Sequence, residues 1–98
     1  LPHALRFNAP VTSGRLHDVA EVLGVPTATA DGDATDSVSR VCREWFDSIG
    51  LPSRLRELNV PHDALALIAD DASQDWFFTQ NPRPMRHDDL LALLEAAW

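Results

Sequence analysis

Apolar residues recur along this chain at intervals of three and four positions, the spacing that places side chains on one face of an α-helix. The clearest run predicts a helix from Asp36 to Ile49, which Gly50 and Pro52 would end. Its apolar positions are Val38, Val41, Cys42, Trp45, Phe46 and Ile49. Because burying a large apolar side chain is worth about 1.5–3 kcal/mol, we expect this face to pack against another part of the protein.

Two further helices are predicted in the first 25 residues. The first covers residues 1–9 and would end at Pro10, because proline has no backbone N–H to continue a helix. The second runs from Gly14 to Leu23, with Thr12 or Ser13 as its N-cap and Gly24 after its last turn. Its inward positions are Leu16, Val19, Ala20 and Leu23. The small, polar segment Val25–Ala34 is expected to be a loop.

The second half of the chain gives the same pattern. Residues 53–58 predict one or two turns, and Pro61 predicts the start of a helix that reaches about Ala72. An irregular aromatic segment follows, and a last helix is expected from Arg86 to Trp98. The inward positions of these two helices are Leu65, Ile68, Ala72, Leu90, Leu93, Leu94 and Ala97. The chain is therefore predicted to be all-α, with about five helices, as a single helical domain over residues 1–98 or a fragment of one.

Composition narrows the possible partners. The chain has 45% hydrophobic and 23% charged residues, which is typical of a folded protein. Its eight arginines, no lysines and fifteen acids give a net charge of −7, which argues against binding to nucleic acid or to an anionic membrane. No apolar run approaches the roughly 20 residues of a membrane span. The single cysteine, Cys42, excludes an internal disulfide and favours a reducing, cytoplasmic location.

The start of the sequence shows no signal peptide. Residues 1–10 show no basic stretch followed by an apolar core, and the first residue is leucine rather than methionine. We therefore expect the chain to have been cut or excerpted from a longer protein.

Few residues suggest catalytic or metal chemistry. The histidines are His3, His17, His62 and His87, and no two of them are three or four positions apart, as a helical two-histidine metal site requires. Surface or capping roles are expected for the last three and a structural role for His3. Cys42 is expected to be a small core residue, and the pairs Asp70-Asp71 and Asp88-Asp89 are expected to be solvated helix ends. Without a glycine-rich phosphate loop, we predict no catalytic, cofactor-binding or metal-binding residue here.

The segment Trp76-Phe77-Phe78-Thr79-Gln80-Asn81 is harder to interpret. Three aromatic residues in a non-helical loop could form a packed crossing between helices or one wall of a ligand pocket. The sequence Asn81-Pro82-Arg83-Pro84 predicts a rigid, extended backbone directly after them. Both interpretations of the aromatic loop stay open on the residues alone.

Three motifs in order along the chain carry a resemblance to a known family. The segments "LPHALRFNAP" at residues 1–10, "IGLPSRLRELNVPHDAL" at 49–65 and "NPRPMRHDDLLALLEAAW" at 81–98 resemble the carboxy-terminal part of the iron-containing alcohol dehydrogenase superfamily. Within it, the Pro-Arg-Pro and "PSRLRELNVP" segments look most like maleylacetate reductases. One departure is Arg86, which stands where relatives usually have a threonine N-cap; Asp88 and Asp89 would compensate through the helix dipole.

The resemblance implies a part of a larger enzyme. The fold would be the helical portion of the dehydroquinate synthase-like superfamily, and the activity would be NAD(P)H-dependent reduction of a small molecule, with maleylacetate reduced to 3-oxoadipate in aromatic-compound catabolism. The dinucleotide-binding portion would lie upstream and is absent here. The intact enzyme would be a homodimer, and the 98 residues alone would be inactive. Metal use stays open, because the family's ligands lie upstream of residue 1; His3 is not one of them.

The resemblance also selects pocket residues. In relatives, the loop before Asn81 approaches the nicotinamide and the substrate, so that Phe77, Phe78 and Asn81 are implied to be pocket neighbours, with Phe77 the strongest candidate. Two alternatives remain: an iron-dependent alcohol dehydrogenase with another substrate, or a non-enzymatic helical module of this family. Such a module would bind a partner through the face formed by Trp45, Phe46 and Ile49.

Overall fold

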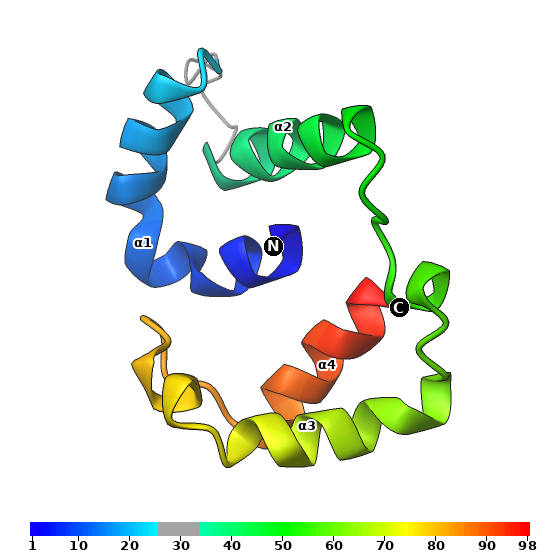
Figure 1. The fold of residues 1–98 in the computed structure, drawn as a ribbon. Helices are drawn as coiled ribbons and strands as arrows, with labels where there is room; N and C mark the ends of the chain where they lie inside the picture. Colours follow the sequence, from blue (N-terminus) through cyan, green and yellow to red (C-terminus); the bar gives the residue numbers. More distant parts are fainter. Residues whose placement is uncertain (26–33) are drawn as a thin grey trace. The chain divides into compact units, whose positions relative to one another are not determined.

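A computed structural model describes residues 1–25 and 34–98. It contains four α-helices, α1 (Pro2–Val22), α2 (Ala34–Ser48), α3 (Leu65–Ser73) and α4 (His87–Ala97) (Figure 1). Three 3-10 helices lie between them, η1 (Leu55–Leu58), η2 (His62–Ala64) and η3 (Trp76–Gln80). These two ranges contain no strand, and the predicted all-α class is confirmed. None of their helices combines the length and the apolar character needed to span a bilayer.

The chain divides into two compact units. Unit 1 is Leu1–Leu51 and unit 2 is Pro52–Trp98. The expectation of a single domain over residues 1–98 stays a prediction. Most of the predicted loop over Val25–Ala34 lies outside the described residues; Val25 itself is non-helical, and Ala34 already begins α2.

The separation of the first 23 residues into two helices is wrong. Pro10 lies inside α1, and Figure 1 shows that this helix bends between its first and second halves. A proline inside a helix removes one backbone hydrogen bond and clashes with the preceding turn, so that the helix kinks instead of ending. Thr12 does not cap a new helix, because its hydroxyl donates to the Asn8 carbonyl oxygen at 2.9 Å within the same helix. Such a back-bond also favours bending.

The bend lets both arms of α1 contribute to one core with α2. The buried residues of this core are Leu16, Ala20, Val25, Ala34 and Val38, and the partly buried residues packed against them are Leu5, Ala9, Val41 and Cys42. Leu5 and Ala9 precede Pro10, whereas Leu16 and Ala20 follow it. Cys42 is therefore a partly buried core residue, as predicted.

The apolar face of α2 is only half covered. The helix begins at Ala34 rather than Asp36, so that Thr35 and Asp36 lie inside it and do not cap it. Val38 is 1% exposed, but Trp45 is 61% exposed and Ile49 is 57% exposed. Residues 1–25 and 34–98 leave part of this face uncovered, so the expectation that the whole face packs stays a prediction.

Glycines end both long helices, as predicted. Gly24 has φ +66° and Gly50 has φ +74°, which are left-handed conformations. After α1, the Gly24 N–H donates to the Glu21 carbonyl at 3.0 Å and the Val25 N–H donates to the Ala20 carbonyl at 2.8 Å. These two bonds form the Schellman motif, which satisfies the last carbonyls of a helix.

Replacing glycine by alanine should change the free energy of unfolding in opposite directions at two positions of unit 1. Gly24→Ala should lower the free energy of unfolding by about 1 kcal/mol, because a side chain disfavours positive φ. Gly14→Ala should raise it by about 0.5–1 kcal/mol, because Gly14 lies inside α1 with open space around its Cα. Urea unfolding of both variants measures the two changes, and changes of the same sign would contradict this assignment.

Unit 2 is built on α3 and α4. Leu65 is 1% exposed and Ala69 is fully buried, while Ile68 and Ala72 are half-buried. The inward residues predicted for α4 are also half-buried: Leu90, Leu93, Leu94 and Ala97. The helix expected to open at Pro61 starts instead with a 3-10 turn, and α3 itself begins at Leu65.

Trp98 ties the end of α4 to the start of unit 2. Its indole Nε1 donates to the Val60 carbonyl oxygen at 2.9 Å. Its ring meets the His62 ring edge-on, with centroids 4.8 Å apart, and the Arg56 guanidinium lies 5.7 Å from its centroid. The Arg54 guanidinium also donates to the Ala96 carbonyl at 3.3 Å.

Two substitutions at Trp98 separate the contribution of its hydrogen bond to stability from that of its ring contacts. Trp98→Phe should lower the free energy of unfolding by about 1–2 kcal/mol, because it keeps a ring but leaves the Val60 carbonyl without its donor. Trp98→Ala should cost more, about 3 kcal/mol, because the ring contacts are also lost. Thermal or urea unfolding measures both; equal losses for the two variants would mean that the ring contacts contribute nothing.

Candidate functional site

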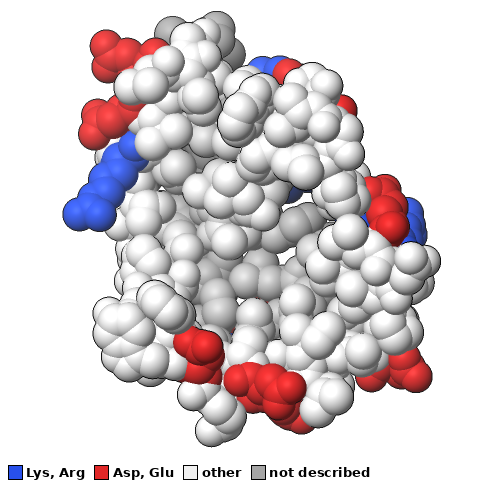
Figure 2. Space-filling view, viewed as in Figure 1, with Lys and Arg blue, Asp and Glu red and all other residues white. Residues whose placement is uncertain are grey.

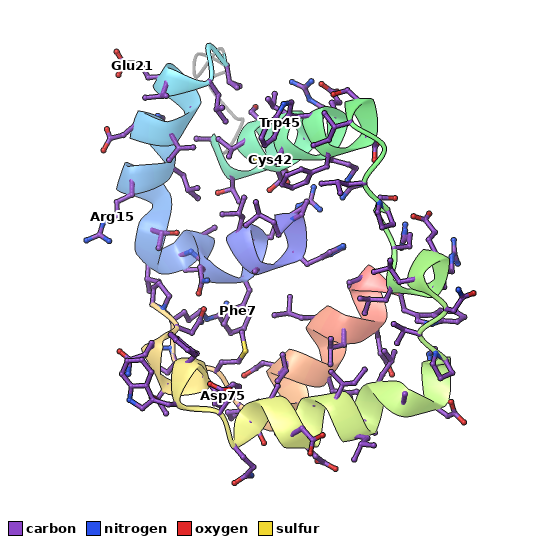
Figure 3. All side chains as sticks on the ribbon, in the orientation of Figure 1. Phe7, Arg15, Glu21, Cys42, Trp45 and Asp75 are labelled. Carbon is purple, nitrogen blue, oxygen red and sulfur yellow. The ribbon has the colours of Figure 1, made fainter. Side chains whose placement is uncertain are left out.

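The aromatic segment expected to be an irregular loop forms a 3-10 helix, η3. Its N-cap is Asp75, which lies just after α3 (Figure 3). One carboxylate oxygen of Asp75 accepts from the Phe77 N–H at 2.8 Å, and the Asp75 carbonyl accepts from the Phe78 N–H at 3.1 Å. The Thr79 hydroxyl donates to the Trp76 carbonyl at 2.8 Å. Side-chain and backbone bonds therefore fix the turn that carries the aromatic residues.

This turn presents two large aromatic rings to solvent. Trp76 is 67% exposed and Phe77 is 74% exposed, and their ring centroids lie 5.1 Å apart in an edge-to-face contact. Phe78 is half-buried. Large apolar side chains on a fixed turn are suited to forming a wall against a ligand or another protein segment.

Asn81 ends the turn and stiffens the segment after it. Its backbone is extended, with φ −62° and ψ 133°, as expected for a residue that precedes a proline. Its side-chain amide Nδ2 donates to the Arg83 carbonyl at 2.6 Å, and the residue is half-buried. The amide nitrogen of Asn81 thus supports the Asn-Pro-Arg-Pro segment.

The sequence interpretation missed Asp75 and left Trp76 out of the implied pocket neighbours. Trp76 is nearly as exposed as Phe77 and contacts it. Asp75 is the residue that caps the turn. An aspartate directly before an aromatic run is a recognisable N-cap signal, but it identifies a turn only if the following residues are expected to be helical.

The histidines and aspartates do not form a metal site in the described part of the chain. No group of three or more His, Cys, Asp or Glu residues there could hold a metal ion. The His87 ring instead links two helices: its Nε2 lies 2.9 Å from an Asp70 carboxylate oxygen and its Nδ1 lies 3.4 Å from Asp88. His17 and His62 are exposed, as predicted. These described residues therefore supply no metal site, and we assign no step to a metal.

Arg86 is the N-cap of α4, which begins at His87. A guanidinium has no acceptor atom, so the arginine side chain cannot cap the helix. Asp89 replaces part of that function, because its Oδ2 accepts from the Arg86 N–H at 2.9 Å. The compensation expected from the acids of this first turn therefore includes a hydrogen bond that Asp89 accepts from the Arg86 N–H.

The capping role of Asp75 predicts that two substitutions at this position lower the free energy of unfolding by different amounts. Asp75→Ala should lower the free energy of unfolding by about 1 kcal/mol and loosen the turn that holds Trp76, whereas Asp75→Asn should retain most of the cap. Asp71→Ala, at an exposed position on α3, is the control. Unfolding curves and tryptophan fluorescence quenching measure stability and mobility; an Asp75→Asn loss as large as that of Asp75→Ala would contradict the capping role.

Comparison with known proteins places the chain in a family. The family model described as "Fe-containing alcohol dehydrogenase family, C-terminal" matches residues 1–98. The chain belongs to the Fe-containing alcohol dehydrogenase family. A crystal structure of 1,3-propanediol oxidoreductase matches it with a TM-score of 0.90 at 27% sequence identity, covering 100% of this chain and 26% of that one. The helical fold inferred from the three motifs is confirmed.

Similar proteins within the Fe-containing alcohol dehydrogenase family have different names. Maleylacetate reductase of Burkholderia cepacia is 33% identical over 98 residues, which cover 100% of this chain and 24% of that protein. Lactaldehyde reductase of Escherichia coli (strain K12) is 30% identical over 103 residues, which cover 100% of this chain and 26% of that protein. The chain therefore spans about a quarter of the length of the curated relatives it matches.

Proposed function

We propose that this chain is the carboxy-terminal helical part of an NAD(P)H-dependent oxidoreductase of the maleylacetate reductase type. The reaction would be reduction of maleylacetate to 3-oxoadipate in the cytoplasm, by an enzyme that is a homodimer when intact. Membership of the family and the 33% identity to maleylacetate reductase support this proposal. The small-molecule substrate and the upstream dinucleotide-binding portion are the partners that it requires.

Exposed apolar surface is the observation that carries the proposal. In unit 1, Trp45 and Ile49 are more than half exposed, and in unit 2 the same holds for Trp76 and Phe77. A self-sufficient helical protein buries side chains of this size, since each is worth about 1.5–3 kcal/mol when buried. Large apolar side chains left in water in both units favour a larger protein that covers them.

In the proposed enzyme, the η3 turn supplies one wall of the substrate pocket. Phe77, Phe78 and Asn81 are the pocket neighbours, with the ring of Phe77 closest to the substrate. The apolar rings would exclude water from the reacting carbonyl, and the fixed backbone would limit the entropy lost when substrate binds. Hydride would come from the bound nicotinamide, whose chemistry belongs to the cofactor.

Substitution of Phe77 tests its role in the pocket. Phe77→Ala in the NADH-oxidising protein should lower kcat/KM for maleylacetate by about 10- to 100-fold, because an apolar contact to the reacting substrate is lost. Leu67→Ala is the matched control, since Leu67 is 62% exposed on α3, outside the turn. An unchanged kcat/KM in Phe77→Ala would remove this residue from the pocket.

A substrate panel separates the proposal from its nearest alternative. The family membership and the 30% identity to lactaldehyde reductase also fit an alcohol dehydrogenase with another substrate. NADH oxidation would be followed with maleylacetate and with lactaldehyde, and NAD⁺ reduction with 1,3-propanediol. A preference for maleylacetate supports the proposal. A preference for either of the others replaces the substrate but keeps the enzyme class, and no activity with any of them favours a non-enzymatic module that binds through Trp45, Phe46 and Ile49.

A further inference from the structure

Three arginines gather at a pocket in unit 1. The pocket has a volume of about 320 Å³ and is lined by Arg6, Asp36, Ser37, Arg40 and Arg43. Arg6 belongs to the first arm of α1, and the other four residues belong to α2, with Asp36 in its first turn and Arg43 past its middle. Positions 36, 40 and 43 are four and three residues apart, so their side chains project from one face of the helix.

The lining of this pocket is positive, although the protein is acidic. Three guanidiniums and one carboxylate give it a formal charge of +2, whereas the whole chain carries −7. On the face shown in Figure 2, acidic side chains are spread widely over the surface. Charges farther away than about 8–10 Å are largely screened at physiological ionic strength, so a mobile anion responds mainly to the local arginines.

Among residues 1–25 and 34–98, few partners are found for the donors of these arginines. Arg6 Nε contacts an Asp36 carboxylate oxygen at 2.8 Å, and Arg40 Nη1 contacts Glu44 at 3.1 Å. A guanidinium has five N–H groups, so each of these exposed pairs uses only some of the N–H donors of its arginine. Among the acids that the structure describes, none lies at ion-pair distance from Arg43.

We propose that this pocket binds a small dianionic ligand that carries either a phosphoryl group or two carboxylates. Arginine forks match the oxygens of both groups and can hold them by two parallel hydrogen bonds. Glu44, paired with Arg40 at 3.1 Å, lowers the charge at the pocket from +2 to +1, which still attracts an anion. The volume lies near the lower end of the range for small-molecule sites, which suits a compact metabolite. Ser37 adds a hydroxyl to the lining.

Titration calorimetry tests the proposal with two probes, inorganic phosphate and succinate, at constant ionic strength set by sodium chloride. The protein should bind at least one probe, and Arg40→Gln/Arg43→Gln should weaken that binding about tenfold or more, because two charge-assisted contacts are lost. Arg43→Gln alone should give a smaller loss without breaking any ion pair among the described residues. Arg15→Gln is the control, since Arg15 projects from the side of α1 away from α2 (Figure 3).

Each outcome decides a separate point. Binding of phosphate alone identifies a phosphoryl ligand, and binding of succinate alone identifies a dicarboxylate. The proposal is overturned if neither probe binds, or if the double variant binds as well as the unchanged protein. It is also overturned if Arg15→Gln weakens binding as much as the double variant, because the effect would then be general charge attraction. Circular dichroism of each variant checks that α1 and α2 remain folded. None of these results depends on the oxidoreductase proposal.

Discussion

The bend at Pro10 determines how unit 1 is assembled. A straight helix of the length of α1 would present only one stretch of its surface to α2. Because the helix turns at the proline, Leu5 and Ala9 before it and Leu16 and Ala20 after it reach one core with Val38. The same placement brings Arg6 to within 2.8 Å of Asp36 on α2, and these two residues line the arginine pocket. One residue that weakens a helix locally therefore determines both the core and the charged pocket of this unit.

The buried residues of the two units include several small side chains. Ala20, Ala34, Ser39 and Ala69 are at most 4% exposed, whereas the largest side chains include several that are mostly in water. Small residues let helix backbones approach closely, but they bury little apolar area. The hydrophobic stabilisation available within the chain is therefore limited, since it scales with the area removed from water. Exposed aromatic surface in both units is the physical basis for the proposal that this chain is part of a larger oxidoreductase.

The sequence predicted helix ends better than it predicted helix continuity. Gly24 and Gly50 end their helices as expected, because glycine, which has no Cβ, adopts the positive φ angles found there without steric cost. Pro10 misled the prediction because a proline either ends or kinks a helix, and tertiary packing decides which. The aromatic loop was found from its composition, but its 3-10 form depends on the Asp75 cap. The sequence did not identify what covers Trp45, because periodicity shows which face is apolar, not what covers it.

The arginine pocket was not visible in the sequence. Arg6 and Arg40 are 34 positions apart, and only the bent helix brings them to one pocket. The family resemblance, in contrast, could be read directly, because its three motifs keep their order along the chain and match residues 1–98. Local motifs are retained in sequence, whereas sites assembled from distant residues need the fold.

Membership in a larger oxidoreductase is best tested by native mass spectrometry of the protein isolated from its own cells, combined with an assay of NADH oxidation by the same sample. We expect these residues to occur together with a dinucleotide-binding portion, in one polypeptide or in a stable complex, and the sample to oxidise NADH with maleylacetate. A lone folded species of 10.8 kDa that neither binds nor oxidises nicotinamide cofactors would contradict this assignment.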